Sequence, residues 1–81
     1  MDTKTRADHA KHLLDDEVLQ SAFDVVKEYH KATFTKATAT DAEVLEARRL
    51  VLLLEQVQGQ LRSFVSAGKI LDKRDQHRAD D

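Results

Sequence analysis

Apolar residues recur every three or four positions along much of the chain, which is the pattern of amphipathic helices. The stretch over residues 16–34 carries them on one side at Val18, Leu19, Ala22, Phe23, Val26, Tyr29, His30 and Thr33. The stretch over residues 41–67 carries a row at Ala47, Leu50, Leu54, Val57, Leu61 and Phe64, and a second row at Val44, Val51 and Gln58. A shorter stretch, residues 5–14, shows the same spacing. The pattern predicts one short helix followed by two long ones.

Capping residues indicate where the two long helices begin. Asp16 precedes the first long apolar pattern, and an aspartate there can accept a hydrogen bond from a backbone N–H of the first turn. Thr40 and Glu43 have the spacing of a capping box, in which each side chain bonds the backbone N–H of the other residue. The threonine-rich segment 33–40 between the helices is a poor helix interior and is predicted to be a linker.

Gly68 is predicted to end the long helix at about Ala67, because glycine is the common residue just past a helix C-terminus. Residues 69–81 are then expected to form a charged, frayed tail. Gly59 lies inside the same helix, where glycine costs about 1 kcal/mol relative to alanine. It indicates either the close approach of another backbone or a tolerated surface position.

Composition supports an all-helical fold. The 81 residues include no proline, no cysteine and two glycines, and 35% of them are charged. The absence of cysteine excludes disulfides and thiolate metal sites. We therefore predict a single all-α domain over residues 1–81: an antiparallel helical hairpin with a short N-terminal helix.

The run of five apolar residues from Leu50 to Leu54 exceeds what one partner helix can cover, because five residues sweep about 400° around a helix axis. A chain of this length also has little room for a core of its own. We therefore expect the chain to self-associate through the long helix. The residues assigned to this contact are Leu50, Val51, Leu53, Leu54, Val57 and Leu61.

The sequence offers few candidates for chemistry. His9 and His12 have a spacing that could bind a metal ion together with Asp8 or Asp16, but a structural site needs further ligands, and we expect two solvated histidines. No glycine-rich phosphate loop or nucleophile elbow is present. We expect no catalytic residue, no metal and no cofactor, and hence no enzyme.

The net charge of −2 gives no general attraction to nucleic acid. Basic residues nevertheless gather at two places on the long helix and its tail, and either belong to a solvated face or form a polyanion contact when many copies assemble. These residues are Arg48, Arg49, Lys69, Lys73 and Arg74. No apolar run is long enough for a membrane span, and the first twelve residues lack a signal-peptide core.

The segments "RADHAKHLLDDEVLQSAFDVVKEYH" and "DAEVLEARRLVLLLEQVQGQLRSFVSAGKI", joined by a short threonine-containing linker, resemble small helical proteins of tailed bacteriophages. Such proteins are encoded among head and DNA-packaging genes, and the hairpin is similar to the oligomerisation core of small terminase subunits. The chain departs from many of those subunits because no helix-turn-helix precedes the hairpin, so no DNA-binding residue is carried over.

The resemblance implies a non-enzymatic homo-oligomer of virion assembly or DNA packaging. Its expected location is the host cytoplasm, and its expected partners are copies of itself and a large terminase or portal protein. The sequence itself does not indicate DNA binding. The alternative is a small phage binding protein that caps a host or phage protein through an apolar helix face.

Overall fold

The computed structural model describes the backbone of residues 1–80 and the side chains of residues 1–75; Asp81 lies outside this range. Helices α1 (Thr3–Asp15), α2 (Glu17–Lys31) and α3 (Asp41–Asp80) follow one another, with one 3-10 turn, η1 (Ala32–Thr35), after α2. The predicted all-α fold class is confirmed. α2 ends at Lys31 and not at about residue 34 as predicted, because the chain continues into η1, which also occupies part of the predicted linker.

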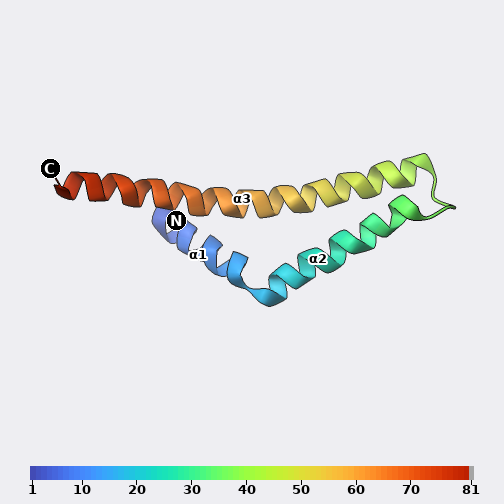
Figure 1. Cartoon of the computed structure of the whole chain (residues 1–81), viewed down its shortest axis with the longest axis horizontal. Helices are drawn as coiled ribbons and strands as arrows, with labels where there is room; N and C mark the ends of the chain where they lie inside the picture. The colour runs from blue at the N-terminus through green and yellow to red at the C-terminus, as the bar shows by residue number, and fades with distance from the viewer. Residues whose placement is uncertain (81) are drawn as a thin grey trace.

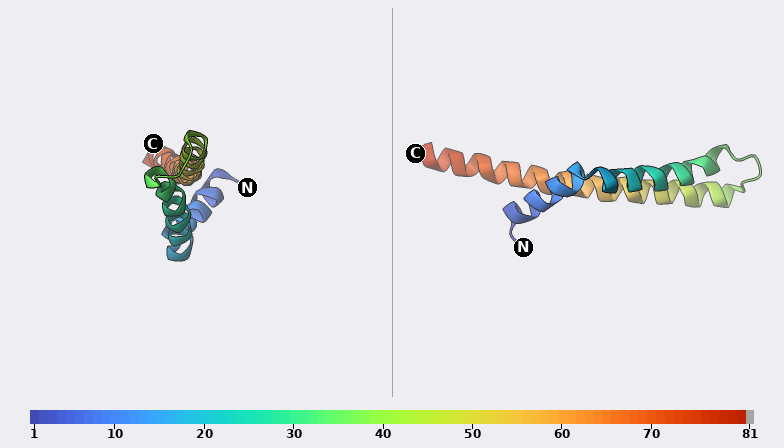
Figure 2. Two further views of the ribbon diagram at one scale, coloured as in Figure 1. Left: turned by 90° about the vertical axis from the view of Figure 1, so that its right-hand side faces the viewer. Right: turned by 90° about the horizontal axis from the view of Figure 1, so that it is seen from below.

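The two shorter helices lie end to end against the single long one. In Figure 1, α1 and α2 meet at a corner near residue 16 and their far ends approach α3, so the three helices outline a shallow triangle. α2 runs antiparallel to α3 from the linker, and α1 crosses α3 obliquely beyond the corner (Figure 2). The molecule is elongated, with extents of 65 × 23 × 19 Å. α1, rather than α2, therefore covers the second half of α3.

One residue makes the corner. Asp16 has an extended backbone conformation (φ −75°, ψ 110°), and its N–H donates to the carbonyl oxygen of Leu13 at the end of α1. Its side-chain Oδ1 accepts a hydrogen bond of 3.0 Å from the N–H of Leu19 in the first turn of α2. The predicted N-cap is confirmed, and the same aspartate also terminates α1.

α1 begins earlier than predicted, at Thr3 rather than Thr5. Asp2 is its N-cap, because its carboxylate accepts a 2.7 Å hydrogen bond from the N–H of Thr5. This hydrogen bond lowers the pKa of Asp2, since it favours the ionised carboxylate. The capping rule that identified Asp16 applies equally to Asp2.

The capping box at the start of α3 is confirmed. The N–H of Glu43 donates to Thr40 Oγ1 at 3.1 Å, and the N–H of Thr40 donates to Glu43 Oε1 at 3.3 Å. The Thr40 hydroxyl also donates to Glu43 Oε1 at 3.1 Å. These bonds satisfy backbone donors that have no partner within the helix.

We expect Thr40→Ala to lower the free energy of unfolding by about 1 kcal/mol, the typical contribution of a side-chain N-cap. Urea denaturation followed by circular dichroism measures this loss. Thr40→Ser, which retains the hydroxyl, is the control and should remain close to wild type. Equal stability of the alanine and serine variants would contradict a stabilising role for the cap.

The predicted end of the long helix is wrong. α3 does not stop at Ala67 but continues through Gly68 to Asp80, giving 40 residues, or about 60 Å. Gly68 does not have the positive φ of a helix-ending glycine. Residues 69–80 contain no proline and many good helix formers, and α1 packs against α3 at Gly68. The glycine permits a helix crossing instead of ending a helix.

The packed face of α3 also differs from the predicted one. The buried positions combine both predicted rows: Ala47 of the first row and Val51 and Gln58 of the second are buried, whereas Val57 of the first row is 51% exposed. The complete row alternates steps of three and four: Val44, Ala47, Val51, Leu54, Gln58, Leu61, Val65 and Gly68. Alanine and glycine in this row let α1 and α2 approach closely, whereas Leu50, Leu53 and Val57 lie beside the row.

Candidate interaction surface

The outer side of α2 carries an exposed row of apolar side chains. Val18, Val25 and Tyr29 are 80%, 66% and 76% exposed, and the smaller Ala22 lies between them. Their spacing of four, three and four residues keeps all of them on one side of the helix over about 16 Å. We call Val18, Ala22, Val25 and Tyr29 the apolar ridge.

A surface depression lies between α2 and α3, next to the ridge. One hollow of about 200 Å³ is lined by Val26, His30, Leu50, Leu53, Leu54 and Val57. A second, of about 210 Å³, is lined by Leu19, Ala22, Phe23, Val26 and Leu54. Because Val26 and Leu54 line both, the two hollows form one depression, which we call the α2–α3 hollow. Ala22 belongs to the ridge and also lines this hollow, so ridge and hollow are adjacent parts of one apolar face.

Four of the six residues predicted to mediate self-association lie in this depression: Leu50, Leu53, Leu54 and Val57. The assignment of Val51 is wrong, because Val51 is only 5% exposed and packs in the interior of its own chain. Leu61 is half-buried in the packed row of α3 and does not line the hollow.

The contribution of α2 was missed. The predicted hairpin implies that the apolar side of residues 16–34 packs on the long helix, yet no residue of α2 is buried. A usable signal was present, because the apolar positions of α2 span more of its circumference than one neighbouring helix covers. The width of the apolar pattern on α2 therefore predicts the exposed ridge, just as the run Leu50–Leu54 predicts surplus apolar surface on α3.

A chain of polar side chains fixes how the three helices meet beneath this face. Lys27 donates to Gln58 Oε1 at 3.0 Å, and Gln58 Nε2 donates to Gln20 Oε1 at 3.3 Å. Gln20 Nε2 in turn donates to the carbonyl oxygen of Leu13 at 3.4 Å. A buried polar group is costly without its partners. The network therefore favours one register of α2 on α3 and holds the apolar face in place.

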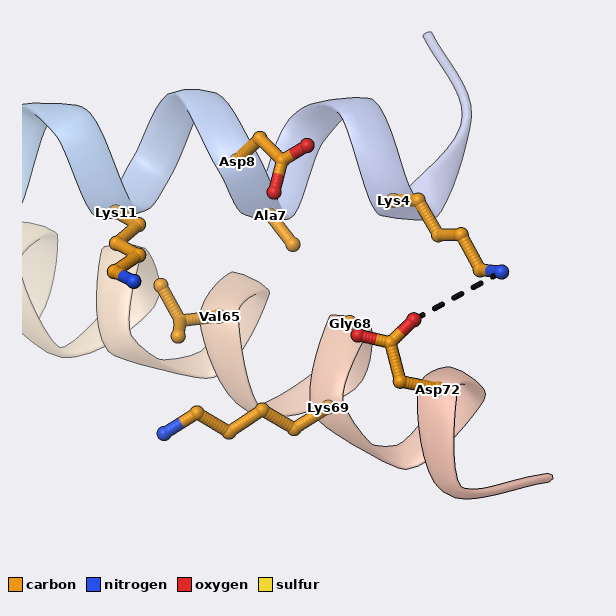
Figure 3. A pocket seen from close by; sticks show the side chains of 8 residues that line it. All are labelled: Lys4, Ala7, Asp8, Lys11, Val65, Gly68, Lys69 and Asp72. Carbon is orange, nitrogen blue, oxygen red and sulfur yellow. Dashed lines mark ion pairs between the residues drawn. The ribbon is translucent and has the colours of Figure 1, made fainter. Parts of the chain in front are cut away.

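α1 is anchored on the other half of α3, where the chain forms a cleft between the two helices. Figure 3 shows Ala7 pointing towards Gly68 and Lys4 reaching Asp72 across the cleft, at 3.8 Å. Lys4 also donates to Asp75, and this bond raises the pKa of Lys4 because it stabilises the charged ammonium group. The Arg6 guanidinium stacks 4.2 Å from the centre of the Phe64 ring.

The cleft is lined by three lysines and two aspartates, so it has little net charge. Lys4 is already paired with aspartates of α3. The remaining polar residues are Asp8, Lys11 and Lys69, and all three are exposed to solvent. The cleft is therefore a helix-docking region and not a preorganised anion site.

The predicted polyanion residues are not brought together. Arg48 and Lys69 are separated by about 32 Å along α3, since each residue adds 1.5 Å. Arg49 pairs with Glu46 at 3.6 Å, and Lys69 lines the α1–α3 cleft. Lys73 and Arg74 are exposed farther along α3. Only a repeated arrangement of copies can combine these charges into one surface.

His9 and His12 are both exposed on α1. Within the described part of the chain, no three histidine, aspartate or glutamate side chains gather where they could hold a metal ion. Gly59 is likewise not approached by another part of its own chain: a Cβ placed there would meet only Arg62, at 3.9 Å. The close-approach interpretation of Gly59 therefore fails within one copy, and it holds instead for Gly68.

None of the helices over residues 1–80 has the length and apolar character needed to cross a bilayer. Of the twelve large apolar side chains that are exposed among residues 1–75, six belong to the ridge or the hollow: Val18, Val25, Val26, Tyr29, Leu53 and Val57. Comparison of the chain with models of protein families, with curated proteins and with solved structures found no match.

Proposed function

We propose that the protein is a non-enzymatic helical assembly protein that works by binding copies of itself. The observation that supports this proposal is that few apolar side chains are buried in the single chain while many are exposed. Among the described side chains, the buried apolar residues are Ala7, Ala10, Ala47 and Val51, and no large side chain is fully buried. A single chain of this kind has little hydrophobic stabilisation, and an association that covers its apolar face supplies the missing burial.

The accessible surface area supports this proposal. The chain exposes 6434 Å² at a mass of 9.2 kDa. A compact monomer of this mass exposes about 4,900 Å², so the excess is about 1,500 Å². Contiguous exposed apolar patches of more than a few hundred Å² are typical of interaction sites. The exposed apolar side chains of the ridge and the hollow lie next to one another on α2 and α3.

The biological setting that we propose is bacteriophage head assembly or DNA packaging, with copies of the chain forming a small-terminase-like oligomer. This part rests on the sequence resemblance and on the long helix that carries the association surface. In such an assembly, a large terminase or portal protein is the further partner. Repetition of the separated basic positions on α3 offers DNA a combined surface.

The experiment that tests self-association is the molar mass of the full chain over a hundredfold range of concentration. We expect a stable multiple of 9.2 kDa in light scattering coupled to size exclusion, dissociating only on strong dilution. A helical monomer at every concentration would contradict self-association and favour a protein that caps a different partner.

A further inference from the structure

The apolar face contains both a projecting part and a receding part of similar length, side by side. We propose that a second copy of the chain covers it through the same face, with the apolar ridge of each copy seated in the α2–α3 hollow of the other. This inference rests on the proposed self-association and adds the surface and the symmetry through which it occurs. An interface made of one patch on both copies is isologous and closes at two, so this contact makes a dimer and a larger oligomer requires a second contact between dimers.

The shape of the apolar face supports this twofold arrangement. The ridge projects from α2, since Val18, Val25 and Tyr29 are largely exposed. The hollow extends beside it over the same helix, from Leu19 to His30. A ridge beside a matching hollow is self-complementary, because a twofold rotation brings each ridge over the hollow of the other copy.

The position and small size of Ala22 also support the twofold arrangement. It is the smallest residue of the ridge and also lines the hollow, so it lies where the two features meet. A small side chain there permits close approach of two α2 helices, as alanine and glycine do between α1 and α3 of one chain. In this arrangement, residues at the boundary between ridge and hollow lie near the twofold axis. Each of them therefore faces the same residue of the other copy.

The surface area allows a second copy as the occupant. A stable interface buries about 800 Å² on each partner, and this elongated chain exposes about 1,500 Å² more than a compact monomer of its mass. The back of α3 offers much less, because its exposed leucines, Leu45 and Leu52, are separated by charged residues including Arg48 and Arg49. The face formed by the ridge and the hollow is therefore better suited to bind a second copy than the back of α3.

Cysteine cross-linking tests the inference, and the absence of native cysteine makes single-cysteine variants unambiguous. In Ala22→Cys, the two thiols face each other near the axis, where the α-carbons can reach the 4.4–6.8 Å that a disulfide requires. Under mild oxidation, we expect most of this variant to become a covalent dimer on a denaturing gel. Leu52→Cys, on the back of α3, is the matched control and should stay monomeric on the same gel.

The outcomes separate the two proposals. A wild-type monomer in solution would overturn self-association and this inference together. A wild-type oligomer in which Ala22→Cys does not cross-link, or in which Leu52→Cys cross-links instead, would leave self-association standing and overturn the shared-face arrangement. Circular dichroism and light scattering on the reduced variants establish that each still folds and associates before oxidation.

Discussion

Replacement of Leu53 by glutamate is expected to convert the oligomer into a monomer while α3 remains helical. Leu53 is 46% exposed in the single chain and lines the α2–α3 hollow. Burial of a leucine side chain contributes about 1.5–3 kcal/mol, and a symmetric interface loses that contribution twice. Burial of an unpaired carboxylate in its place adds a further cost. We expect the dissociation constant to rise by at least about a hundredfold, since each 1.4 kcal/mol is a factor of ten.

The matched control is Leu52→Glu. Leu52 adjoins Leu53 on the same helix and is 49% exposed, but it does not line the hollow. The two variants therefore change the same residue type at nearly equal exposure on different sides of α3. Light scattering should give a monomer for Leu53→Glu and the wild-type mass for Leu52→Glu. Wild-type mass for Leu53→Glu would exclude the hollow from the interface.

Replacement of Gly68 by alanine is expected to weaken the docking of α1, whereas the same replacement at Gly59 is expected to stabilise the protein. A Cβ on Gly68 would overlap the Cβ of Ala7, and both atoms belong to tightly placed helices. Such overpacking costs typically about 1–3 kcal/mol, which opposes the gain of about 1 kcal/mol from removing a helical glycine. At Gly59 a new Cβ has only ordinary contact with Arg62, so the gain in helix propensity is unopposed.

Urea denaturation at one fixed protein concentration compares the two variants, because association makes stability depend on concentration. Hydrogen exchange of the α1 amides identifies the cause, and we expect faster exchange there in Gly68→Ala than in wild type. If both glycine variants gain stability equally, Gly68 is not the crossing point of α1 and α3.

The sequence by itself determined the helical elements and most of their boundaries. The capping residues Asp16 and Thr40 act through hydrogen bonds to backbone groups within three residues, so their effect is visible without tertiary information. The same local rule identifies Asp2. Part of the exposed apolar face was also predictable, because the width of an apolar pattern shows that one neighbour cannot cover it. The run from Leu50 to Leu54 predicts that some leucines are not covered within one hairpin, and Leu53 is 46% exposed.

The tertiary structure alone decided which face of each helix is packed and what Gly68 does. Hydrophobicity favours one row of large apolar residues as the packed face of α3, yet the buried positions combine Ala47 of that row with Val51 and Gln58 of the other. Close packing depends on the shapes of side chains on two helices at once, and a small residue gains its importance from what lies opposite it. Gly68 has the same helical backbone as its neighbours, and only the position of Ala7, 61 residues earlier in the chain, makes it a crossing point instead of a helix end.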